Sequence, residues 1–260
     1  MYKTLVHPII ANSLKMSVFL ATKVRPPRTI RAEEFTSQIT LSELLSKTQP
    51  GDLLLSGSNI DSYSRGLRSI FGGKFSHSGV VWHDGAEPWL ISSNLFDYSI
   101  RPKEYPSHLM KDYFTGETEV GPGLIKMKTF VEASRKVQGD WFVYRKLVGG
   151  NKQEIANDLF TYVKNIDKKR FPTEEEEIAQ MFVFLLGLQN RIKKPGQMGA
   201  TCNEVVIEAL RTAKILKSEY AQKAWTLPVK VLEKGNWMEE QMMQDFYYED
   251  EVWVKLDDEK

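Results

Sequence analysis

The chain has one cysteine and four histidines, and two of these residues stand in contexts that suit catalysis. His77 lies in "GGKFSHSGVVW" (72–82), where two glycines precede a short run typical of a strand. Cys202 follows 125 residues later, in "GATCNEVVIEAL" (199–210). Cysteine-dependent acyl transfer requires a thiol nucleophile and a base, and imidazole is a common base. His77 and Cys202 therefore form the first candidate pair.

Cys202 stands where a helix is expected to begin. Thr201 and Glu204 have the spacing of a capping box, and the residues that follow form one apolar helical face: Val205, Val206, Ala209, Leu210 and Ala213. A helix start favours a thiolate, and its free amides can hold an oxyanion. A lone cysteine is also often a small buried apolar residue, and a lone strand histidine is often structural. Residue type alone leaves both interpretations open.

The intervening sequence predicts an α+β domain. The expected strands cover residues 52–56, 74–82, 89–94, 124–130 and 140–147. The expected helices cover residues 41–47, 61–71, 152–166 and 173–194. Asp61 is a plausible N-cap of the second helix and Gly72 its stop, whereas Asp84 and Gly85 suit the turn of a hairpin.

The two ends differ in charge and divide the chain into three parts. Residues 1–35 form a basic arm, residues 36–215 the main domain, and residues 216–260 an acidic, aromatic extension. The arm has the composition of a transit peptide, but it lacks the cleavage pattern of a secretory signal, and we expect it to dock on the domain. The extension either binds a partner through its aromatic residues or closes the core with a last strand, "EVWVKL" (251–256).

Composition excludes several classes of protein. Lys and Arg together number 35 and Asp and Glu 34, so no overall field attracts nucleic acid. One cysteine excludes an internal disulfide and suits a reducing intracellular compartment or a virion. The histidines lack close metal-ligand spacing, and we expect no metal and no cofactor. The longest apolar run, residues 178–188, is too short to span a bilayer and predicts a buried helix.

The order of several short motifs resembles that of the permuted papain-like cysteine hydrolases. This is the branch of the NlpC-type superfamily in which the histidine strand precedes the cysteine helix, and it occurs in bacteria, eukaryotes and large DNA viruses. The similarity covers about residues 49–215. The motifs are, in order, "PGDLLLSGS", "SRGLRSIFGGKFSHSGVVW", "LISSNLFDYSIRP", "FVYRKL" and "TCNEVVIEAL". The resemblance implies a circularly permuted papain-like fold, with an antiparallel sheet packed against helices.

The same resemblance assigns roles to particular residues. In that family a Gly-Asp pair opens the first strand, an sHxG strand carries the base, and a CSE helix start carries the nucleophile. The matching positions here are Gly51 and Asp52, His77 and Gly79, and Cys202 and Glu204. After the cysteine this chain reads CNE, a small departure from the family pattern.

The residue that orients the imidazole departs further from the family. Similar members read WESN on the strand after the histidine, whereas this chain reads ISSN, with Ser92 in the place of the glutamate. Serine can accept a hydrogen bond from an imidazole but cannot stabilise an imidazolium as a carboxylate does. Alternation along a strand gives Asn94 the same face as Ser92, and asparagine has this role in papain-like enzymes. The candidate catalytic residues are thus Cys202, His77, Asn94 and, as a weaker alternative to Asn94, Ser92.

Two functions follow from the resemblance. The first is a cysteine-dependent hydrolase or acyltransferase that acts on an amide, ester or thioester bond of a peptide or lipid. The second is a weakened or inactive papain-like fold that serves as an assembly component, such as a minor capsid protein in the virion of a large DNA virus. The missing carboxylate and the two charged termini favour the second, because such termini can bind protein partners.

Overall fold

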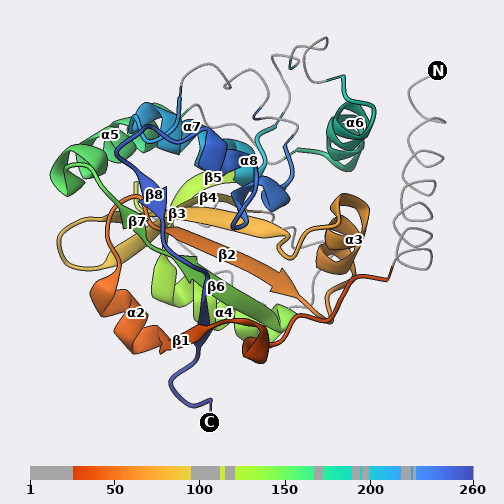
Figure 1. The fold of residues 1–260 in the computed structure, drawn as a ribbon, viewed down its shortest axis with the longest axis horizontal. Coiled ribbons are helices and arrows are strands. Elements are labelled where there is room, and N and C mark those ends of the chain that lie inside the picture. Colours follow the sequence, from red (N-terminus) through yellow and green to blue (C-terminus); the bar gives the residue numbers. More distant parts are fainter. Residues whose placement is uncertain are drawn as a thin grey trace.

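The computed structural model describes residues 26–94, 112–114, 121–166, 172–188, 194, 199–217, 224 and 227–259, and shows an α+β fold (Figure 1). Its strands are β1 (Ser37–Thr40), β2 (Leu53–Ser58), β3 (His77–His83), β4 (Pro88–Asn94), β5 (Gly121–Lys126), β6 (Asp140–Arg145), β7 (Leu147–Val148), β8 (Tyr247–Tyr248) and β9 (Val252–Lys255). Its helices are η1 (Ala32–Glu34), α2 (Leu41–Lys47), α3 (Ser62–Phe71), α4 (Met127–Gln138), α5 (Lys152–Asn165), α6 (Glu174–Leu185), α7 (Cys202–Thr212), η4 (Val229–Leu232) and α8 (Trp237–Glu240).

The main sheet has seven strands in the order β1-β9-β6-β2-β3-β4-β5. All neighbouring strands are antiparallel except β1 and β9, which are parallel, so the sheet is mixed and not purely antiparallel as expected. The C-terminal strand β9 lies between β1 and β6. Of the two alternatives for the extension, the structure therefore shows the last strand, and residues 252–255 belong to the same sheet as the main domain.

Two apolar cores lie on opposite faces of this sheet. Along β3, Val80 and Trp82 belong to the core that α5 and α7 cover, whereas Val81 belongs to the core under α2 and α4. Figure 1 shows α5 and α7 on one side of the sheet and α2 and α4 on the other. Both faces of the central strands are consequently buried, so apolar residues occupy successive positions and not alternate ones.

Local signals located several elements correctly. The Asp61 side chain caps α3 by accepting a hydrogen bond from the Ser64 amide at 2.7 Å, and Gly72 ends the helix with a φ of 65°. Asp84 accepts hydrogen bonds from the two amides that follow Gly85, and this closes the β3–β4 hairpin. These predictions are confirmed because each depends on contacts within a few residues.

The expected strand over residues 124–130 is wrong in its second half. Strand β5 ends at Lys126, and α4 begins at Met127. Met127, Phe130 and Val131 are buried together beneath the sheet, at the spacing of one helical face. The alternation of apolar and polar residues in "LIKMKTF" imitates a strand, but packing on this core selects the helix.

Helix α6 begins as expected but ends earlier. Thr173 and Glu176 form the capping box, and the helix ends at Leu185 instead of continuing to residue 194. Gly187, with a φ of 66°, allows the Leu188 amide to bond the Val183 carbonyl at 2.9 Å. Such a left-handed glycine closes a helix and stops its elongation.

The apolar run 178–188 is also less buried than expected. Phe182, Leu185 and Leu186 are 59%, 54% and 65% exposed. The helix packs on the body through its other side, where Val183 is buried and the Phe184 ring lies 5.5 Å from that of Phe71 in α3. The helix lies at the periphery, so only one side of the run is covered.

A buried carboxylate joins the start of β2 to β6. Asp52 accepts hydrogen bonds from the Gln49 amide at 2.7 Å, the Leu147 amide at 2.8 Å and the Tyr144 hydroxyl at 2.6 Å. Burial raises the pKa of Asp52 from 3.8 to about 6, and the hydrogen bonds from Tyr144, Leu147 and Gln49 offset only part of that effect. The carboxylate is therefore a buried titratable group at the start of the central strand.

A buried guanidinium holds the C-terminal segment. Arg145, fully buried at the end of β6, donates from Nη1 to the Leu232 carbonyl at 2.8 Å and from Nη2 to Glu239 at 2.5 Å. Its guanidinium also lies 5.3 Å from the centre of the Tyr248 ring. These contacts fix residues 229–248 against the sheet, because an uncompensated buried guanidinium is strongly destabilising.

The titration of Asp52 predicts a measurable dependence of stability on pH. Its pKa in the folded protein, about 6, exceeds the reference value of 3.8, so its contribution to the free energy of unfolding is greatest below pH 4 and is lost as pH rises through 6. The loss amounts to about 3 kcal/mol at most. Urea denaturation between pH 4 and 7 should show the free energy of unfolding of the wild type falling relative to that of Asp52→Asn as pH rises, because only the wild type carries the titrating carboxyl group. A difference that is constant across this range would contradict the assignment.

Candidate active site

Cys202 is the first residue of α7, as predicted. Thr201 is the N-cap, and its side chain accepts a hydrogen bond from the Glu204 amide at 3.2 Å. Cys202 forms no disulfide, and the residue is only 7% exposed. The expected apolar face of this helix is buried in the core on the α7 side of the sheet. The helix start thus presents a nearly buried sulfur beside amides that can stabilise negative charge.

The Glu204 carboxylate, two residues after the thiol, is neutralised by a lysine. Lys194 donates to both of its oxygens, at 2.5 and 2.6 Å, and both side chains are largely buried. This pairing removes much of the repulsion that Glu204 would exert on a thiolate. Sequence reasoning missed Lys194, because its distance in sequence from the helix start matches no known pattern.

His77 is the first residue of β3, and its ring has a defined orientation. Its Nε2 lies 3.0 Å from the Ser92 hydroxyl, which lies 2.7 Å from the Ser78 carbonyl. A carbonyl only accepts hydrogen bonds, so the single proton of the hydroxyl goes to Ser78 and the Ser92 oxygen accepts from Nε2–H. The neutral imidazole then carries its proton on Nε2, and Nδ1 is the basic nitrogen. Ser92, the weaker of the two candidates for the orienting role, thus contacts the imidazole directly.

The side chain of Asn94 is outside the part of the chain that the structure describes, so the role expected of it stays a prediction. Asn94 is the last residue of β4, and its backbone pairs with Gly121. Of the four candidate residues, the structure thus joins His77 to Ser92 directly.

The side chains of His77 and Cys202 lie on opposite faces of the sheet. The His77 ring lies 5.4 Å from that of Phe130, which belongs to the core under α4, whereas Cys202 packs in the core under α7. Both nonetheless lie at the same end of the sheet, because Ser93, next to the end of β4, donates to the Ala200 carbonyl at 2.6 Å. An imidazole–thiol contact would therefore have to form around the start of β3, because the two side chains share no face of the sheet.

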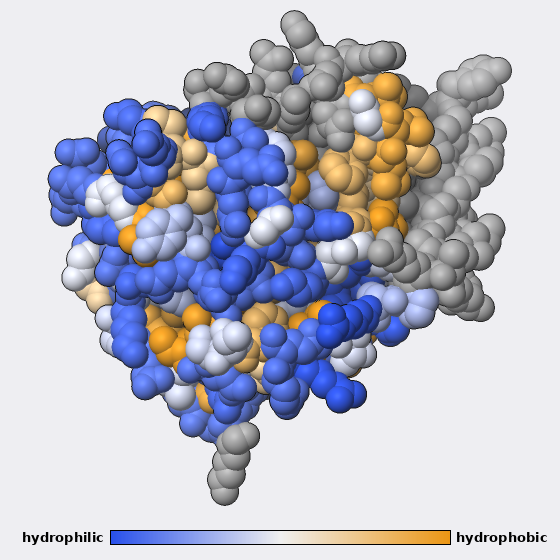
Figure 2. Space-filling view, in the orientation of Figure 1, coloured by the Kyte–Doolittle hydropathy of each residue, from blue (hydrophilic) through white to orange (hydrophobic). Residues whose placement is uncertain are grey.

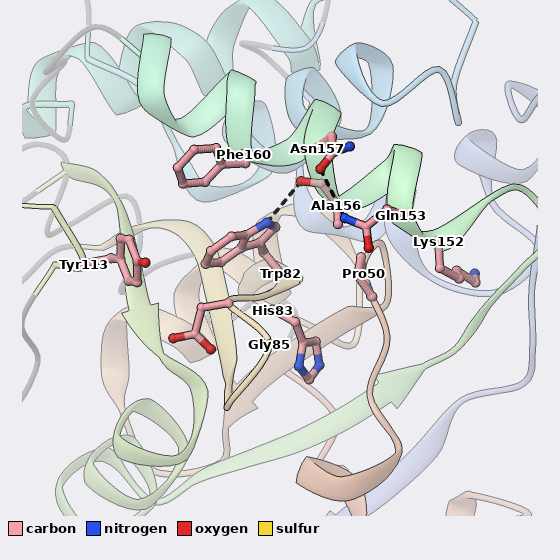
Figure 3. A pocket seen from close by; sticks show the side chains of 11 residues that line it. Pro50, Trp82, His83, Gly85, Tyr113, Lys152, Gln153, Ala156, Asn157 and Phe160 are labelled. Atoms are coloured by element: carbon pink, nitrogen blue, oxygen red, sulfur yellow. Dashed lines mark hydrogen bonds between the residues drawn. The ribbon is translucent and has the colours of Figure 1, made fainter.

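A cavity of about 600 Å³ lies at the other end of β3, between the hairpin and α5 (Figure 3). Trp82 and Phe160 stack there with ring centres 5.3 Å apart, and the Trp82 indole donates to the Ala156 carbonyl at 3.0 Å. Burial lowers the pKa of His83, which also lines the cavity, and so favours the neutral form of this imidazole. The length of β3 separates this cavity from His77 by roughly 20 Å.

Within the described ranges, no group of three or more His, Cys, Asp or Glu side chains is arranged to hold a metal ion. None of the helices in these ranges has both the length and the apolar character needed to cross a bilayer.

No family model and no curated protein matches the chain. Among solved structures, one similar chain is described as the metalloprotein YiiX from Escherichia coli O157:H7. It has a TM-score of 0.38 and 14% sequence identity, over 80% of this chain and 99% of that chain. Similarity at this level assigns neither a fold family nor a function.

The Ser92 contact predicts the tautomer of His77. Nitrogen-15 NMR of the wild-type imidazole should show the proton on Nε2, and Ser92→Ala should give a mixture, because losing one hydrogen bond costs about 1 kcal/mol, or roughly fivefold in the tautomer ratio. Ser93→Ala is the matched control, since Ser93 bonds Ala200 and should leave the His77 spectrum unchanged. A wild-type ring protonated on Nδ1 would contradict the assignment.

Proposed function

We propose that this protein is a cysteine-dependent hydrolase or acyltransferase of the permuted papain-like type, acting on an amide, ester or thioester bond. The observation that carries the proposal is the hydrogen bond between His77 and Ser92, which leaves Nδ1 of the imidazole as the base. The position of Cys202 at a capped helix start supports it, because such a position favours the thiolate. The chemistry requires no bound group beyond the chain and an acyl substrate.

In the proposed reaction His77 Nδ1 takes the proton of the Cys202 thiol, and the thiolate attacks the acyl carbonyl. Amides at the start of α7 hold the resulting oxyanion, and the protonated imidazole returns the proton to the leaving group. Water or an acceptor nucleophile then attacks the thioester and releases the acyl group from Cys202. Because Ser92 cannot stabilise the imidazolium as a carboxylate would, we expect a weaker base than in papain-like enzymes that carry the glutamate.

A second candidate function is an assembly component, such as a minor capsid protein, built on an inherited hydrolase fold. The specific observation in its favour is that the His77 ring and the Cys202 thiol pack on opposite faces of the sheet. A base acts only within hydrogen-bond reach of the proton that it removes. The two functions therefore differ in whether His77 affects the reactivity of Cys202.

An acylating activity probe separates the two functions. The probe should label the wild type on Cys202, should not label Cys202→Ala, and should label His77→Ala about a hundredfold more slowly, the usual contribution of a general base. His83→Ala is the matched control, because His83 lies at the far end of the same strand and should leave labelling unchanged. Labelling of wild type and His77→Ala at equal rates would refute the catalytic pair and favour the assembly role.

A further inference from the structure

Helix α6 presents an apolar ridge to solvent, made of Phe182, Leu185 and Leu186. These residues are spaced i, i+3 and i+4, so they lie on one side of the helix end. In Figure 2 the ridge belongs to the orange area over α6. Single exposed apolar residues are common, whereas adjacent large ones on one face indicate a contact surface.

The other side of α6 packs against the body of the protein. Phe184 packs on Phe71, Gln180 and Val183 are buried, and the Glu176 carboxylate accepts from the Gly199 amide at 3.3 Å. These contacts fix which side faces outward. The ridge therefore has a constant position relative to the body of the protein.

We propose that residues 1–25 of this same chain dock on the α6 ridge. The point at which this arm joins the body supports the assignment. Arg68 of α3 donates to the Arg28 carbonyl at 3.4 Å, and Phe71, one helical turn further along α3, is the residue that contacts Phe184 of α6. The arm thus leaves the described fold close to the helix that it is proposed to cover.

The composition of the arm complements α6. Residues 1–25 contain four cations and no acid, whereas α6 begins with four consecutive glutamates, residues 174–177. The arm also supplies apolar residues for the ridge: Leu5, Val6, Ile9, Ile10, Leu14, Val18, Phe19, Leu20 and Val24. Fully extended, 25 residues reach about 80 Å, so chain length does not limit docking. A second copy of α6 would bring further glutamates to the ridge in place of cations.

Photo-crosslinking tests the occupant of the ridge directly. In the full-length chain, p-benzoylphenylalanine in place of Leu186 should crosslink to residues 1–25, and the same group in place of the exposed Gln153 on α5 should not. Mixing nitrogen-15-labelled and unlabelled chains distinguishes crosslinks within one chain from those between chains. Crosslinks from residue 186 to a second chain, or no crosslink to residues 1–25, would overturn the proposal.

Limited trypsin digestion gives a second, independent measurement. Cleavage after Lys15 and Lys23 should become about tenfold faster when Phe182, Leu185 and Leu186 are all changed to serine, since the arm then loses its apolar contact. Ile60→Ser is the matched control, because Ile60 is 71% exposed but does not belong to α6. The serine changes are at exposed positions, and circular dichroism verifies that the fold is retained. Equal cleavage rates in wild type and the triple variant would contradict docking.

Discussion

The arrangement of the sheet depends on the buried turn Gly51–Asp52. Gly51 has a φ of 93°, and a Cβ there would lie 2.5 Å from the Leu147 side chain, so only glycine fits. The backbone carbonyl of Asp52 accepts from the Val81 amide at 2.8 Å, and that of Gly51 accepts from the Tyr248 hydroxyl at 2.8 Å. Together with the bonds to its carboxylate, this turn connects β2 to β3, to β6 and to the C-terminal segment. The ionised carboxylate of Asp52 costs more free energy to bury than the neutral carboxyl group does. The stability of the strands that meet at this turn therefore depends on pH.

This turn also sets the geometry of the candidate site. Because Val81 is bonded to Asp52, the register of β3 against β2 is fixed, and His77 lies opposite Ser56. A shift of one residue would exchange the two faces of the strand and bring the imidazole to the α7 side. The hydrogen bond to Asp52, 25 residues before His77, therefore determines two features of the site. It allows His77 to contact Ser92, and it puts the imidazole on the face of the sheet opposite Cys202.

The sequence predicts those parts of the fold that depend on short-range contacts. The caps at Asp61 and Thr201 located α3 and α7, and the second of these also located Cys202 at a helix start. Two things could not be predicted from local pattern. The chain over Met127–Phe130 satisfies a strand pattern equally well, and only its core selects the helix. Likewise, β3 is buried on both faces, so its apolar residues carry no information about which face α7 covers.

The start of α7 is held from two directions. The Gly199 amide donates to Glu176 of α6, and the Ala200 carbonyl accepts from Ser93 of β4. The position of Cys202 therefore depends on a peripheral helix as well as on the central sheet. Since α6 is capped by Thr173 and packed through Phe184, a contact on its outer ridge acts on the same rigid helix whose first turn holds Gly199. Helix α6 is thus connected by one hydrogen bond to Gly199, three residues before the thiol, and a partner on the α6 ridge would contact the helix that makes this bond.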